Sequence, residues 1–72
     1  MPIVMAPLHT DVKVIKILTD EKVKKHLENL GITIDSTLQV LSAAAGSVIL
    51  QVKDGRLALD KQMATKILVR VQ

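Results

Sequence analysis

Few side chains in this 72-residue chain could do chemistry, and its two histidines come first. His9 and His26 are the only imidazoles, and Asp11 follows His9 closely. Neutral imidazole suits ferrous iron and other divalent transition metals, and a carboxylate can complete such a ligand set. His9, Asp11 and His26 are therefore the candidate metal ligands. Because nothing in their spacing makes them converge, we interpret both histidines as ordinary surface residues and keep a divalent-metal sensor or carrier as an alternative.

The sequence lacks the motifs of the common enzyme classes. It has no Cys, which excludes a disulfide scaffold, a thiolate metal site and a Cys nucleophile. It also has no nucleophile elbow, no HExxH helix and no phosphate-binding glycine loop. Gly31, Gly46 and Gly55 are isolated, and each fits a turn. We therefore predict a protein that is not an enzyme. The sequence establishes no cofactor, and a divalent transition metal ion is the one that its histidines leave open.

The basic residues are the other group of side chains that could bind a partner. Ten Lys and Arg against seven Asp and Glu give a net charge of +3, and the densest group is Lys22, Lys24 and Lys25. These lysines could meet an acidic partner or a phosphate, although a solvated helix face is the favoured explanation. The chain has no Phe, Tyr or Trp on which bases could stack. A nucleic-acid-binding small barrel is therefore only a second alternative, and no nucleic-acid partner is expected.

The length and composition indicate one small domain over residues 1–72. Apolar residues make up 49% of the chain, too many for a disordered tail. No apolar run approaches the roughly 20 residues of a membrane span. The first residues lack the basic region of a secretory signal, so we expect a cytoplasmic protein. A core this small has little stability to spare, which makes a partner surface or a homo-oligomer plausible.

The first half of the chain predicts a strand followed by a helix. Residues 1–10 are expected to form an irregular lead-in that lays Ile3, Val4 or Leu8 on the core. Residues 11–18 predict a strand whose alternation changes phase near Val14 and Ile15, which either a bulge there or burial on both faces would explain. Residues 20–30 predict a helix that is capped by Thr19 or Asp20, with an apolar stripe at Val23, Leu27 and Leu30. Gly31 fits a left-handed residue after the helix.

The second half predicts short strands. Residues 38–42 and 48–53 alternate in polarity, with a hairpin loop at 43–47. Asp54-Gly55 is a strong hairpin signal, after which Leu57 and Leu59 point inward. Asp60 caps about one helical turn, and residues 68–71 form the last strand. The fold class is therefore mainly β: a small, SH3-like, partly open β-barrel with one helix after the first strand and a short helical turn before the last.

Two stretches of the sequence resemble the ferrous iron transport protein A (FeoA) family. Residues 27–32 read Leu-Glu-Asn-Leu-Gly-Ile and precede Leu-Gln-Val-Leu at 38–41; residues 55–59 read Gly-Arg-Leu-Ala-Leu and precede Ala64, Ile67 and Val69. The same pattern is similar to the C-terminal SH3-like domain of diphtheria toxin repressor-type iron-dependent regulators. The family usually has Pro-Gly where this chain has Ile34-Asp35, in a turn that needs positive φ at its second central residue.

The resemblance implies a small cytosolic accessory or regulatory protein of ferrous iron uptake, whose partner is the cytosolic part of the ferrous iron transporter, FeoB. The narrow apolar stripe of the helix leaves apolar surface at its edge, and Gly31 allows close backbone approach. We therefore predict that the partner contacts the helix and the corner after it, at Lys22, Lys24, Lys25, Leu27, Leu30, Gly31 and Ile32. Leu41 and Ile49, which are out of phase with the core, could form a second exposed apolar patch, although core packing is the favoured explanation.

Overall fold

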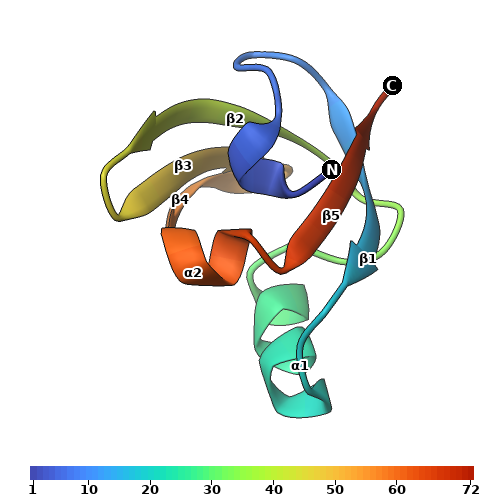
Figure 1. Ribbon diagram of the computed structural model, residues 1–72. Helices are drawn as coiled ribbons and strands as arrows, with labels where there is room; N and C mark the ends of the chain where they lie inside the picture. Colours follow the sequence, from blue (N-terminus) through green and yellow to red (C-terminus); the bar gives the residue numbers. More distant parts are fainter.

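A computed structural model describes residues 1–72 and has one five-stranded antiparallel sheet that coils into a small barrel (Figure 1). The strand order is β4-β3-β2-β1-β5. Helix α1 joins β1 to β2, helix α2 joins β4 to β5, and a 3-10 helix, η1, precedes β1. Their bounds are η1 Ile3–Met5, β1 Val12–Ile17, α1 Glu21–Asn29, β2 Thr37–Ala44, β3 Ser47–Val52, β4 Gly55–Asp60, α2 Lys61–Ala64 and β5 Ile67–Val71. The predicted SH3-like fold class is confirmed.

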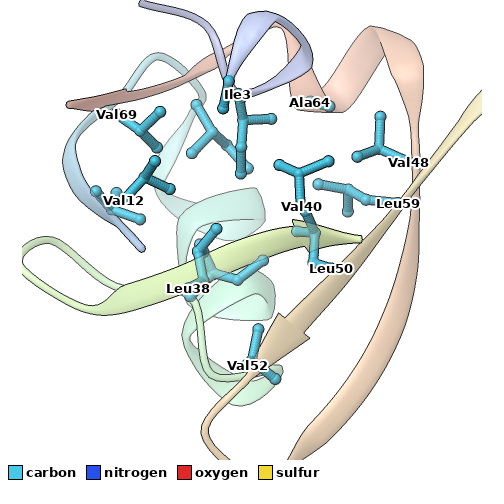
Figure 2. Close-up of a cluster of buried hydrophobic side chains, with 14 of the residues drawn as sticks. Ile3, Val12, Leu38, Val40, Val48, Leu50, Val52, Leu59, Ala64 and Val69 are labelled. Atoms are coloured by element: carbon cyan, nitrogen blue, oxygen red, sulfur yellow. The ribbon is translucent and has the colours of Figure 1, made fainter. Parts of the chain in front are cut away.

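The core of the barrel is entirely aliphatic. Sixteen residues are buried and none of them is polar or charged. Figure 2 shows that side chains from every strand meet there, together with Ile3 from η1 and Ala64 from α2. In β3 the alternation is complete: Val48, Leu50 and Val52 are buried. This burial follows from the period of two that the sequence shows over these residues.

The bulge in β1, one of the two explanations for the change of phase, is confirmed. The register between β1 and β5 shifts between Val14 and Lys16. Val14 and Ile17 are both buried, and the two residues between them, Ile15 and Lys16, are both exposed. A bulge explains this pattern, because it places two consecutive side chains on one side of a strand.

A second bulge, in β2, was not predicted. The register between β2 and β3 shifts between Val40 and Ser42, so that Leu41 is the extra residue. The inward alternation therefore ends at Val40, and Ser42 is exposed rather than inward. Leu41 and Ile49 do not join the core, and both side chains are half-buried, so the second apolar patch is only partly exposed.

The hairpin between β2 and β3 is tighter than the sequence indicates. Strand β2 continues to Ala44 and β3 starts at Ser47, so the predicted five-residue loop at 43–47 contracts to a two-residue turn. Gly46 has a φ of +89°, which lets the chain reverse within this short span. The Asp54-Gly55 hairpin forms as predicted, since Val52 pairs with Gly55.

The first residues are more ordered than an irregular lead-in. Of the three candidates for packing on the core, Ile3 is fully buried and Val4 packs against the core, as predicted, whereas Leu8 is 49% exposed. Met1 and Pro2 lie along the outer edge of β5: the Val69 N–H donates to the Met1 carbonyl at 2.7 Å, and Pro2 bridges to Leu68. The segment therefore covers part of an otherwise unpaired strand edge.

Candidate partner-binding site

Helix α1 is fixed at its start by a side-chain cap. Of the two predicted caps the structure uses Asp20, whose carboxylate accepts the Val23 N–H at 2.9 Å. Glu21 places a negative charge in the first turn, where the helix dipole favours it. Val23 is half-buried against the core, and Leu27 is the one buried residue of the helix. The helix therefore lies on the barrel along a narrow stripe and exposes its other faces.

The end of α1 is a rigid corner. The Ile32 N–H donates to the Leu27 carbonyl and the Gly31 N–H donates to the Glu28 carbonyl, both at 2.9 Å. This is the hydrogen-bond pattern of a Schellman motif, and Gly31 takes the left-handed position that it requires, with a φ of +96°. A Cβ on Gly31 would lie 3.7 Å from the nearest Val52 atom, an ordinary contact. The backbone angle, and not lack of space, therefore calls for glycine here.

Two of the predicted contact residues at this corner are buried, which corrects the prediction. Leu27 is 1% exposed and Ile32 is fully buried, because the Schellman motif brings the two side chains together over the core. Neither can offer its side chain to a partner. Leu30 lies between them in sequence but is 38% exposed. The apolar part of the predicted surface is therefore Leu30, beside the backbone of Gly31.

The three clustered lysines do not share one face. Lys24 is half-buried and forms the only ion pair in the structure, with Glu21 at 3.7 Å. Lys22 and Lys25 are exposed and three residues apart, so they are neighbours on the helix surface. His26 is exposed four residues after Lys22, and Leu30 follows four residues later on the same row. The basic surface that continues to Leu30 thus consists of Lys22 and Lys25, and Lys24 lies on the other flank.

The turn after the corner adds an exposed apolar residue that the sequence analysis missed. The Ser36 N–H donates to the Thr33 carbonyl at 3.1 Å, and Asp35 has a φ of +72°. Asp35 therefore adopts the positive φ expected where the family usually has glycine. Ile34 is 50% exposed at the first central position of this turn. Its place in a turn, where side chains face solvent, was the signal that could have identified it.

A cleft of about 520 Å³ separates this corner from the hairpin between β3 and β4. Its lining is polar: Gly31, Thr33, Ser36, Thr37, Lys53 and Asp54. Leu30 directly precedes the lining residue Gly31 in the sequence, and Ile34 directly follows Thr33; both side chains are exposed. Together they give a small surface with apolar anchors and a polar surround, which is the composition of a protein–protein interface.

The candidate metal ligands are not brought together. His9 has a φ of +58°, and its N–H donates to the Val40 carbonyl. The Asp11 carboxylate accepts the Gln39 amide at 2.7 Å, and His26 is exposed on α1. No group of three or more His, Cys, Asp or Glu side chains could hold a metal ion. The residues therefore do not favour the metal sensor or carrier.

Anaerobic titration calorimetry with ferrous ion tests this point. We expect no binding tighter than about millimolar, which corresponds to about −4 kcal/mol, because too few ligands converge. The His9→Ala and His26→Ala variants should give the same trace as the unmodified protein. Micromolar binding that either substitution abolishes would instead show that a site assembles from these side chains.

The FeoA domain family matches residues 1–71 of the chain. Among solved structures, an iron uptake regulatory protein (FeoA) is 28% identical, with a TM-score of 0.88 over 100% of this chain and 96% of that one. A FeoA-like protein from Clostridium acetobutylicum is 26% identical, with a TM-score of 0.82 over 99% of this chain and 85% of that one. A comparison with curated proteins finds no match.

The same fold occurs in part of a longer protein. ScaR, solved with bound Zn²⁺, has a TM-score of 0.88 to this chain at 18% identity, over 100% of this chain and 37% of that one. At this identity the likeness concerns the fold alone, and it agrees with the resemblance to the SH3-like domain of diphtheria toxin repressor-type regulators. Neither α1 nor α2 is long and apolar enough to cross a membrane.

Proposed function

This chain belongs to the FeoA family and so takes part in ferrous iron uptake, and on that premise we propose that it binds the cytosolic part of the ferrous iron transporter, FeoB, as an accessory protein. The FeoA family is one of accessory transport and regulatory proteins, which agrees with the lack of catalytic motifs. The proposed contact is the surface formed by Lys22, Lys25, Leu30, Gly31 and Ile34, which we call the corner surface.

The observation that carries this proposal is an exposed leucine on a rigid corner. Leu30 is 38% exposed, although the residues that flank the corner, Leu27 and Ile32, are locked in the core. An apolar side chain held in this way loses little conformational entropy when a partner covers it. Such anchors carry most of the energy of an interface, while the surrounding contacts exclude water.

The charges beside this anchor favour an acidic partner surface. Lys22 and Lys25 are exposed, and neither forms an ion pair within the chain. Charges at the rim of an interface mainly accelerate association and set its salt dependence. We therefore expect the Lys22→Gln/Lys25→Gln variant to associate more slowly at low salt, with little change in the dissociation rate.

The sharpest test of the corner surface is Leu30→Gln, measured by calorimetric titration against the purified cytosolic domain of the transporter. We expect about tenfold weaker binding, the loss of one central anchor. The matched control is Met5→Gln, because Met5 is 70% exposed on η1, away from the corner. Thermal unfolding of both variants checks that each one folds.

Three outcomes decide the proposal. Weaker binding of Leu30→Gln alone supports the corner surface. Equal loss in both variants contradicts the surface, because the effect is then not local. Absence of binding between the unmodified protein and the folded transporter domain overturns the choice of partner itself.

A further inference from the structure

The outer side of the β1–β5 ladder carries an unusual concentration of positive charge. Lys13 pairs directly with Arg70, and Lys16 pairs with Leu68. The Leu18 N–H donates to the Lys66 carbonyl at 2.8 Å, which extends the same ladder by one step. Three of the ten basic residues of the chain, Lys13, Lys16 and Arg70, thus lie on two adjacent strands, and Lys66 immediately precedes the second of them. Figure 1 shows β1 and β5 side by side.

The burial pattern places these side chains on one side of the ladder. In β5, Ile67 and Val69 are buried, so Arg70 points the other way, and Lys66, in the turn before β5, is exposed. In β1, Val12, Val14 and Ile17 are buried, and the bulge turns both Ile15 and Lys16 outward. We call the outward set the cationic ladder face: Lys13, Ile15, Lys16, Leu18, Lys66 and Arg70.

No negative charge within the chain neutralises this face. None of its four cations forms an ion pair. The two carboxylates that flank β1 in sequence are engaged elsewhere, Asp11 with the Gln39 amide and Asp20 with the Val23 N–H. Like charges directly opposite each other, as at Lys13 and Arg70, destabilise a sheet. An external anionic surface would relieve that repulsion.

Exposed aliphatic side chains are interspersed with the cations. Ile15 is 43% exposed and Leu18 is 49% exposed. Positive charges arranged around exposed aliphatics match an anionic bilayer, in which the cations meet headgroups and the aliphatics enter the acyl boundary. A nucleic acid would find no aromatic side chain to stack on. The positive charge also continues past the strands, since Lys66 lines a second cleft of about 650 Å³ together with Lys61.

From this charge complementarity we propose that the cationic ladder face binds the surface of membranes that contain anionic phospholipids. This inference goes beyond the proposed function and does not depend on the transporter. The corner surface lies on α1 and the turn after it, so the two surfaces share no residue. A protein that holds a membrane transporter with one surface could rest on the surrounding lipid with the other.

The test is sedimentation with vesicles of mixed phosphatidylglycerol and phosphatidylcholine, compared with pure phosphatidylcholine. We expect binding to the mixed vesicles alone, and we expect it to weaken as salt screens the charges. Each Lys near an anionic bilayer contributes about fivefold to partitioning, so Lys16→Gln/Lys66→Gln should bind about 25-fold more weakly. Leu18→Ser should weaken binding with little effect on its salt dependence.

The matched control is Lys53→Gln/Arg56→Gln, which removes the same charge at the hairpin on the opposite edge of the sheet. It should retain binding within about threefold, because only general attraction is reduced. Equal losses in the two double variants would overturn the proposal in favour of diffuse charge attraction. Absence of binding to mixed vesicles would overturn it too, as would tighter binding of polyglutamate or duplex DNA through the same lysines. None of these results changes the outcome expected for Leu30→Gln.

Discussion

Leu27→Ala is expected to lower the free energy of unfolding by about 2–5 kcal/mol, the range for a large buried aliphatic truncated to alanine. Leu27 is 1% exposed and is the one buried residue of α1, so it supplies most of the attachment of that helix to the barrel. It also packs in the core with Ile32 across the Schellman motif. A domain of this length has only about 4–11 kcal/mol in total. The substitution therefore removes a large share of its stability.

Urea unfolding followed by circular dichroism measures this loss directly. The control is Leu30→Ala, because Leu30 ends the same helix but is 38% exposed. We expect that variant to lose less than about 1 kcal/mol. If both variants lost the same amount, the two leucines would have equal burial, and the assignment of Leu30 to the partner surface would have to be withdrawn.

Ile3→Ala is expected to have a comparable effect, about 2–5 kcal/mol. Ile3 is fully buried, and η1 holds it in place through the Ala6 N–H, which donates to the Ile3 carbonyl at 3.1 Å. Figure 2 places its side chain in the same cluster as Val12, Val40 and Val69. The first residues of the chain therefore belong to the core.

Thermal and urea unfolding of Ile3→Ala, beside Met5→Ala, separates this view from an unstructured lead-in. Met5 lies in the same short helix but is 70% exposed, so its truncation should change stability by less than about 0.5 kcal/mol. A loss below about 1 kcal/mol for Ile3→Ala would mean that the segment is not packed as described.

The elements that were predicted correctly are specified by residues that lie close together in the sequence. Asp20, Val23, Leu27 and Gly31 are close in sequence, and together they specify where α1 starts, which side packs and how it ends. The bulge in β1 was visible because the apolar residues themselves change phase. These features follow from chain geometry over one or two turns, and tertiary contacts only reinforce them.

The features that were missed depend on pairing between distant segments. Nothing near Ala43 and Ala44 favours a strand, but pairing with Val48 and Ser47 extends β2 through them. The same ladder imposes the bulge at Leu41. Met1 and Pro2 likewise acquire order from the edge of β5, which the first residues alone do not reveal.

For the same reason, only part of the candidate site could be predicted from the sequence. Helical spacing alone places Lys24 on the opposite side of the helix from Lys22, so this part of the site was predictable from the sequence. The contrast between exposed Leu30 and buried Ile32 needed the geometry of the corner. The cationic ladder face could not be seen at all, because Lys13 and Arg70 become neighbours only when the first and last strands pair.

That pairing also determines when the protein can fold during its synthesis. β1 is hydrogen-bonded to β5 from Ile17–Ile67 through to Val12–Val71, and Ile67 and Val69 complete the core. Contacts between segments so far apart in sequence require the loop between them to close first, which slows folding relative to local structure. While β5 is still inside the ribosome, the rest of the chain lacks the core residues that β5 supplies. The domain therefore completes its core only after β5 has emerged.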